Sequence, residues 1–321
     1  MPPAADTQVA AGWVRVFGGL LSTDRPLPGL PVATPGDGQF SLWELTTTSA
    51  PDATVPHSDG AVVIGRQPYA NGVDVTLATG SFGPEITISD TGRFTFAADG
   101  RRVFHVAPGN VNRGAVALDL IGVILPYVLH REGAWCVHAS AVHTHDGVIA
   151  FIAPRGTGKS TLATACVQRG CALVADDVVV LRQSPHGITV TPTGLPLRLR
   201  ADTARALGAP ESGNDEWGKV RVEGTLVREE RTLAAIYVLS PVEPGVAVER
   251  VARGSRAAAL ALLAHGKIAE LLGADMGGDA LTRCVDIAQR TTVFDLAVPR
   301  DLARLRDVTD ALIDWHHGAA S

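Results

Sequence analysis

Short stretches of alternating apolar and polar residues recur through the first 112 residues. Five of them lie at 61–64, 73–77, 85–89, 94–97 and 103–106, and turn-forming clusters at 70–72, 90–92 and 99–100 separate them. Alternation with a period of two is typical of strands that have one buried face. The pattern predicts a β-rich N-terminal lobe over residues 1–112, with residues 46–59 as a loop.

From residue 113 onward the pattern changes to helices interleaved with strands. Helical spacing predicts a helix over 115–129, and apolar runs predict strands over 134–143, 148–153 and 173–175. A glycine-rich stretch and a helix over 159–169 separate the last two strands, and Gly170 stands where a helix-ending glycine belongs. This order predicts an α/β core within a second domain, residues 113–321.

The C-terminal third is expected to be mixed. Alanine- and leucine-rich spacing predicts helices over 255–272 and 280–289, followed by a strand over 293–298 and a final helix over 301–315. Apolar residues at this spacing indicate core packing and are not candidates for a site.

Composition narrows the function classes. Of the 321 residues, 46% are apolar and 19% are charged, and the net charge is −5, which argues against non-specific nucleic-acid binding. The four cysteines form no C-x-x-C pair, so they predict reduced thiols without a zinc site. Neither a signal peptide nor an apolar run of bilayer length is evident, since the longest run, 121–129, contains Pro126. A cytoplasmic protein without a membrane anchor is expected.

Lysine is scarce in this chain. Lys159, Lys219 and Lys267 are the three lysines among 28 basic residues, and the other 25 are arginines. Where arginine supplies most of the positive charge, a lysine that remains is more often in a role that needs lysine specifically. This points first to Lys159.

The stretch from Ala153 to Ser160 reads A-P-R-G-T-G-K-S and fits the phosphate-binding (Walker A) pattern G-x-x-x-x-G-K-[ST] except at its first position. Its two glycines permit positive φ, which turns backbone N–H groups toward an anion. Lys159 can reach the β- and γ-phosphates of a nucleotide, and Ser160 can ligate Mg²⁺. The sequence therefore predicts binding of ATP and Mg²⁺ by a loop with these members: Arg155, Gly156, Thr157, Gly158, Lys159, Ser160 and Thr161.

Two adjacent acids, Asp176 and Asp177, end a buried strand 17 residues after the loop lysine. An acid at such a strand end commonly holds Mg²⁺ in phosphate-loop enzymes, and a second acid can take a proton from an attacking hydroxyl. A solvated turn is the plainer alternative.

His138 precedes the loop lysine by 21 residues. If residues 134–143 and 148–153 form a hairpin around Asp146-Gly147, His138 lies opposite the start of the loop. There it could ligate metal, contact phosphate or orient an acceptor, and a hydrogen-bonded core histidine is the equally weighted alternative.

Together, His138, the G-x-G-K-S loop and the L-V-A-D-D strand resemble the HPr kinase/phosphorylase superfamily. The V-H-A-S-A-V stretch from Val137 to Val142 is similar to that of stand-alone HPr-kinase-like proteins found with peptide-maturation genes. The resemblance implies a phosphate-loop core with a mixed sheet, as in HPr kinase and PEP carboxykinase, and a kinase that uses ATP and Mg²⁺ to phosphorylate a serine or other hydroxyl.

Roles follow from the resemblance by position. It implies that Lys159 and Ser160 handle phosphate and metal, that Asp176 is the catalytic base, that Asp177 is the metal partner, and that His138 is an accessory contact. Related kinases often form oligomers, so a homo-oligomer is an option that the sequence leaves open. The acceptor could be a peptide, a protein or a small molecule.

Two departures bear on the reaction. Thr161 stands where the HPr enzymes have glutamate, and the segment 194–200 reads G-L-P-L-R-L-R in place of E-I-R-G-L-G. Both argue against phosphorolysis and against HPr as the acceptor. Arg198 and Lys219 are further candidates for contacts, although a plain surface charge is the favoured alternative for each. The alternative from another class is a nucleotide-sensing regulatory protein that binds ATP without kinase turnover.

Overall fold

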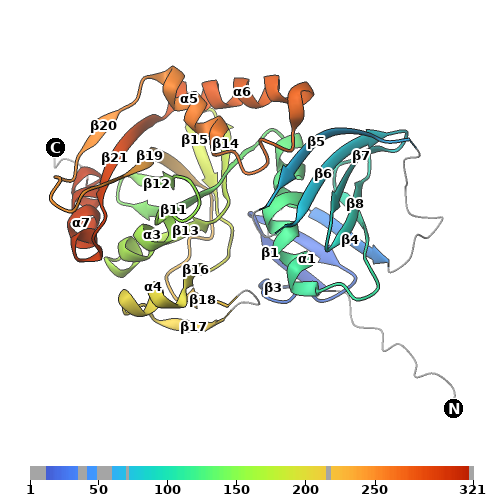
Figure 1. Ribbon diagram of the computed structural model, residues 1–321, viewed down its shortest axis with the longest axis horizontal. Coiled ribbons are helices and arrows are strands. Elements are labelled where there is room, and N and C mark those ends of the chain that lie inside the picture. Colours follow the sequence, from blue (N-terminus) through green and yellow to red (C-terminus); the bar gives the residue numbers. More distant parts are fainter. Residues whose placement is uncertain (1–11, 35–41, 49–59, 70–71, 215–217, 318–321) are drawn as a thin grey trace, which may run out of the picture. The chain divides into compact units, whose positions relative to one another are not determined.

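The computed structural model describes residues 12–34, 42–48, 60–69, 72–214 and 218–317, without the side chains of 211–212 and 274–276. The chain divides into two compact units, residues 1–120 and 121–321, and each is described by itself. Both contain a nine-stranded sheet, and the second adds helices and a three-stranded sheet (Figure 1). The expected β-rich region followed by a mixed α/β region is therefore observed.

Unit 1 is one sheet in the order β3-β1-β2-β4-β9-β8-β7-β6-β5. Consecutive strands β5 to β9 pair antiparallel, whereas β4 pairs parallel with both β2 and β9. Its strands are β1 (Gly12–Val16), β2 (Gly19–Thr23), β3 (Val32–Ala33), β4 (Leu42–Thr48), β5 (Val62–Pro68), β6 (Asp74–Gly80), β7 (Gly83–Ile88), β8 (Gly92–Phe96) and β9 (Arg102–Val106).

The five predicted strands correspond to β5 through β9, and the alternation did not reveal the first four. The β1–β2 hairpin turns on Phe17 and Gly18, both at positive φ, which is a conformation that Phe rarely adopts. The predicted loop at 46–59 is wrong at its start, because residues 46–48 continue β4 and pair with β9. Residues 49–59 of that loop, and residues 70–71 of a predicted turn, lie outside the described residues.

A helical stretch joins the two sheets in the sequence. It runs through α1 (Arg113–Asp119), a π-helical turn at Leu120–Ile124 and α2 (Leu125–Arg131), somewhat longer than the predicted 115–129. By length and composition the whole stretch, 113–131, could cross a membrane, although 78% of its most apolar window is buried. The expectation that no segment reaches this length is therefore corrected, and a buried core helix passes the same test.

Unit 2 is built on a mixed sheet in the order β10-β14-β15-β19-β12-β11-β13, with β21 beside β19 and β20 beside β21. Here β12, β19 and β21 run parallel, and β11 pairs antiparallel with both β12 and β13. The strands are β10 (Trp135–Val137), β11 (Ala139–Thr144), β12 (Gly147–Ile152), β13 (Ala172–Asp176), β14 (Val179–Ser184), β15 (Gly187–Thr191), β19 (Arg231–Val242), β20 (Arg250–Ala252) and β21 (Thr292–Pro299).

Helices cover this sheet and bury its apolar side chains. Helix α3 (Lys159–Gln168) packs against β11 and β13, α7 (Leu305–Trp315) packs against α3, and α5 (Ser255–Ala264) packs against α6 (Gly273–Arg290) (Figure 1). The core beneath α3 includes Phe151, Leu162 and Tyr237, all buried. A small sheet of β16 (Leu197–Arg200), β17 (Glu211–Asn214) and β18 (Lys219–Val222), with the short helix α4 (Ala201–Ala206), adds its apolar face to the same core.

Two predicted elements are interrupted. The strand predicted at 134–143 breaks at His138, because β10 pairs with β14 whereas β11 pairs with β13. The helix predicted at 255–272 ends as α5 at Ala264, and the chain then turns before α6. Both interruptions lie beside the acids that the sequence singled out.

Candidate functional site

The loop between β12 and α3 has the backbone that its glycines predict. Gly156 and Gly158 have φ of 83° and 102°, values that side-chain-bearing residues rarely adopt, and Gly158 is the N-cap of α3. Ala153, at the position where the motif has glycine, is fully buried in the core. The exposed part of the loop is the turn at 154–156.

Lys159, the first residue of α3, folds back across this loop. Its Nζ donates to the carbonyl oxygens of Ala153 at 2.8 Å and Pro154 at 3.2 Å, and the residue is only 6% exposed. Burial lowers the pKa of Lys159 to about 8, against the opposing attraction of Asp177 and Asp176. The ammonium is thus held at the loop by neutral carbonyls, which an anion could replace as its partners.

Asp176, the last residue of β13, is buried and receives three hydrogen bonds. Its Oδ1 accepts from the hydroxyls of Ser160 at 2.8 Å and Ser140 at 2.6 Å, and its Oδ2 accepts from the backbone N–H of Arg198 at 3.2 Å. Ser140 is fully buried and lies opposite Asp176 in the β11–β13 register. The carboxylate is therefore fixed against the first turn of α3.

Asp177 is more exposed and is surrounded by basic side chains. Its carboxylate lies 2.8 Å from Lys267 Nζ and 3.8 Å from an Arg198 guanidinium nitrogen. His138 Nδ1 lies 3.1 Å from both the carboxylate and the backbone carbonyl of Asp177. Burial alone would raise the pKa of this carboxyl, but Lys267, His138 and Arg198 together hold it well below its usual range.

A corner in the sheet brings His138 to Asp177. Val137 pairs with Val179 in β10–β14 and Ser140 pairs with Asp176 in β11–β13, so His138 and Asp177 lie in the unpaired gap between these two ladders, which we call the corner. Asp177 makes this turn with a φ of 70°, which aspartate tolerates better than most residues. The histidine thus contacts the second acid and not the loop.

The position of Lys267 depends on the close approach of two backbone segments, residues 265–267 after α5 and residues 136–138 at the end of β10. The N–H of Lys267 donates to the Cys136 carbonyl, and the N–H of His138 donates to the His265 carbonyl, both at 2.8 Å. Gly266 lies between these bonds, and a Cβ there would be 2.4 Å from Trp135 Cζ2. Glycine permits the contact that delivers the lysine to Asp177.

The structure brings together His138, Lys159, Ser160, Asp176 and Asp177, and Arg198 joins them. Of the other candidates, Arg155 is exposed, and the charge of Lys219 contributes to lowering the pKa of Lys159.

Sequence reasoning missed Ser140 and Lys267. The scarcity of lysine was the one signal for Lys267, although it was applied first to Lys159. Ser140 lies inside the V-H-A-S-A-V stretch, where a serine in a buried apolar strand gives no signal of a role.

The oxygen atoms at Ser160 and Asp176 suit magnesium. A hydroxyl and a carboxylate oxygen 2.8 Å apart are hard ligands of the kind that Mg²⁺ takes, and it commonly binds one or two such groups together with nucleotide phosphates. No cluster of three or more histidine, cysteine or acidic side chains able to hold a metal occurs among the described residues. The donor set therefore fits a metal that arrives with a nucleotide better than a metal held by protein ligands alone.

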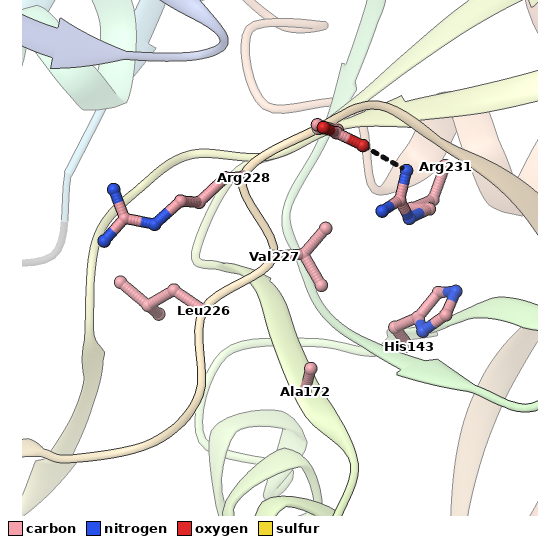
Figure 2. A pocket seen from close by; sticks show the side chains of 7 residues that line it. His143, Ala172, Leu226, Val227, Arg228 and Arg231 are labelled. Carbon is pink, nitrogen blue, oxygen red and sulfur yellow. Dashed lines mark hydrogen bonds and ion pairs between the residues drawn. The ribbon is translucent and has the colours of Figure 1, made fainter.

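A separate cavity lies at the opposite end of the same strands. It measures about 390 Å³ and is lined by residues that include His143, Ala172 and Arg231, the last paired with Glu229 at 2.9 Å (Figure 2). His143 pairs with Ala172, whereas Ser140 pairs with Asp176, so the length of β13, about 13 Å, separates this cavity from the acids. The cavity is not the candidate site.

No model of a known protein family matches the sequence, and no curated protein matches it. Among solved structures, the HPr(Ser) kinase/phosphatase from Coxiella burnetii is similar over 56% of this chain and 95% of its own, with 15% identity and a TM-score of 0.31. A TM-score this low carries no weight for function, so the geometry of the site bears the functional argument.

Proposed function

We propose that this protein is an ATP-dependent phosphotransferase that uses Mg²⁺ and transfers the γ-phosphate to a serine or other hydroxyl. One observation carries the proposal. The hydroxyl of Ser160, at the start of a helix preceded by a glycine loop, donates a hydrogen bond to the buried carboxylate of Asp176. A hydroxyl and an acid in this relation are the pair that holds magnesium in phosphate-loop enzymes. A solvated turn would leave the acid exposed, whereas Asp176 is buried and bonded three times.

The loop residues act as binding groups. Lys159 exchanges its carbonyl partners for phosphate oxygens, and the N-terminus of α3 directs its unpaired N–H groups at the same anion. Magnesium, when bound, would neutralise charge on the phosphates while Ser160 and Asp176 hold it. Lys267 and Arg198 place two more positive charges at Asp177, where charge on the transferred group would be stabilised.

For the two acids we propose the opposite division of roles from the one that the sequence resemblance implies. Asp176 is buried against Ser160 and fits the metal role, whereas Asp177 is more exposed and fits the acceptor side. His138 fixes the orientation of Asp177. In phosphoryl transfer the base mainly orients the hydroxyl, so a carboxylate with a low pKa can serve.

A second function is favoured by a specific observation. Asp177 is engaged by Lys267 and His138, and these contacts would have to loosen before it could take a proton. An ATP-binding sensor without turnover would need no such step. Binding of ATP without transfer to any hydroxyl would support the sensor.

The test compares Asp176→Asn with Asp177→Asn. ATP binding is titrated by calorimetry with and without Mg²⁺, and transfer is followed with γ-labelled ATP. Asp176→Asn should abolish the gain in ATP affinity that Mg²⁺ provides, whereas Asp177→Asn should keep that gain and lose transfer. Asp307→Asn, at an exposed acid in the first turn of α7, is the matched control. Normal transfer by Asp177→Asn would reject it as the base, and unchanged Mg²⁺ dependence in Asp176→Asn would remove the main support for the proposal.

A further inference from the structure

His265, the C-cap residue of α5, lies beside the residues that surround Asp177. Its backbone carbonyl accepts from the N–H of His138 at 2.8 Å, and Lys267, two residues later, donates to the Asp177 carboxylate at 2.8 Å. The backbone therefore pairs His265 with one contact of this acid and places it two residues from another. The side chain of His265 is half-buried.

The charged groups that act on this imidazole belong to both parts of the site. Lys159 of the phosphate loop acts most strongly, followed by His138 beside the acids and by Arg253, which is itself bound to Asp295 at 2.6 and 2.8 Å. Burial is the largest cause that lowers the pKa of His265, and these three charges lower it further. The imidazole is therefore uncharged at neutral pH, with one N–H donor and one acceptor nitrogen.

Neither ring nitrogen of His265 has a hydrogen-bond partner among the residues that the structure describes. Other histidines of unit 2 do: His138 bonds Asp177, and the buried His316 bonds the hydroxyl of Tyr237 at 2.7 Å. A half-buried donor without a protein partner is satisfied by water or by a ligand. Because the lysine of the phosphate loop is the charge that acts on the ring most, a bound phosphate is the ligand that fits this donor.

We propose that His265 donates a hydrogen bond to the γ-phosphate of bound ATP and thereby distinguishes ATP from ADP. This rests on the proposed function. The γ-phosphate moves from the nucleotide at the loop to the acceptor at Asp177, so it occupies the space between them. The ring of His265 has neighbours on both sides of that space, Lys159 on the loop and His138 at the acid. The α- and β-phosphates are held by the loop backbone and do not need this residue.

The surroundings of the ring make this contact specific for the third phosphate. In the free protein the charge of Lys159 disfavours a positive charge on His265. A γ-phosphate bound beside both side chains brings negative charge to the ring, which then makes a charge-assisted hydrogen bond to a phosphate oxygen. ADP brings no charge to this position. The contact should therefore raise the affinity for ATP about tenfold and leave the affinity for ADP unchanged.

The experiment measures two dissociation constants by calorimetry with the full chain and Mg²⁺, one for ADP and one for an ATP analogue with an imido bridge between its β- and γ-phosphates. His265→Ala should raise the Kd of the ATP analogue about tenfold and leave the Kd of ADP unchanged. His265→Gln keeps an N–H donor and should recover part of the loss. His186→Ala, at an exposed histidine in the turn between β14 and β15, is the matched control and should change neither constant.

Two results would overturn the inference: equal losses of affinity for the ATP analogue and for ADP in His265→Ala, or no loss for either nucleotide. If His265→Ala does not fold, nuclear magnetic resonance of the wild-type chain with ¹⁵N-labelled histidine decides, with His265→Gln used to assign the signal. The ring nitrogens of His265 should shift with the ATP analogue and not with ADP, and equal shifts or none would reject the contact. Failure of the wild-type chain to bind either nucleotide would reject the proposed function, and the inference with it.

Discussion

The two nine-stranded sheets of this chain handle buried polar side chains in different ways. In unit 1 the partners are close in sequence: His105 stacks on Phe94 and bonds the Thr91 carbonyl at 2.8 Å, and Thr91 in turn donates to Asp119 at 2.6 Å. These bonds join residues 14 and 28 positions apart, within the segment from β8 to α1. Such pairs complete local structure and need no ligand to explain them.

In unit 2 the polar groups come from distant segments. Asp177 meets His138 from 39 residues away and Lys267 from 90 residues away, and Asp176 meets Ser140 from 36 residues away. Long-range convergence requires loops and corners that cost conformational freedom. The comparison indicates that convergence from several elements, and not burial of polar groups as such, marks the candidate site.

The largest expected effect is on ATP affinity, which should depend on unit 2 and not on unit 1. Lys159→Met removes the loop ammonium and should weaken ATP binding by about 100-fold, because a charge-assisted contact to phosphate is lost. Arg102→Met, an exposed arginine of unit 1, should leave it unchanged. Calorimetric titration measures both. Undiminished ATP binding by Lys159→Met would place the nucleotide elsewhere.

A second variant tests whether tertiary packing sets the convergence. Gly266→Ala places a Cβ against the Trp135 ring and should destabilise the protein by about 2 kcal/mol, the usual cost of overpacking. It should also weaken transfer by displacing Lys267. Gly277→Ala in α6 meets nothing within 4 Å and should be neutral or slightly stabilising. Urea unfolding gives both values, and equal effects of the two changes would contradict the packing argument.

The pH dependence of binding probes the buried lysine. Lys159 must be protonated to pair with phosphate, and its pKa near 8 means that the free protein loses this proton as pH rises from 7 to 9. ATP affinity should fall about tenfold over that range, with proton uptake on binding at the higher pH. Calorimetry in buffers of different ionisation enthalpy measures the uptake. Lys159→Arg should bind more weakly but with a flat profile, since arginine stays charged.

The smallest effect belongs to unit 1. Burial raises the pKa of Asp119 to about 6, so the fold favours its protonated form. The resulting stabilisation is complete below about pH 4 and is lost as pH rises through 6. Asp119→Asn keeps an acceptor for Thr91 without the charge, and should stabilise unit 1 by about 1 kcal/mol at pH 7.5 and by almost nothing at pH 4.5. Hydrogen exchange of unit 1 amides tests this, and unchanged ATP binding is the control.

The sequence predicted the elements around the loop well because their signals are local. The apolar run of β12, the glycines at 156 and 158 and the helix from Lys159 each follow from neighbouring residues. The hairpin count correctly placed His138 next to the start of the loop in register, since Ala139 pairs with Ile152. What it could not show was the corner that turns the histidine to Asp177.

The remaining site residues depend on long-range contacts. Lys267 arrives through backbone pairing with β10 and the fit of Gly266 on Trp135, and neither leaves a mark in the residues around the lysine. Ser140 lies in a strand that reads as uniformly buried, so its bond to Asp176 is invisible without the register. The cross-strand pairing of Arg198 with Arg221 joins segments 23 positions apart around α4 and β17.

The left-handed backbone of Asp177 decides which substitutions there are informative. Asparagine tolerates this conformation and glycine adopts it freely, whereas alanine pays about 1 kcal/mol or more for its Cβ. A change to alanine would therefore combine a lost carboxylate with a shifted corner, and it would move His138 and Val179 as well. Asparagine and glycine both keep this backbone conformation and both lack the charge. A difference between the two variants therefore measures the hydrogen bonds of the side chain. At this position a change to alanine would measure the cost of the backbone conformation, whereas a change to asparagine would measure the loss of the carboxylate charge.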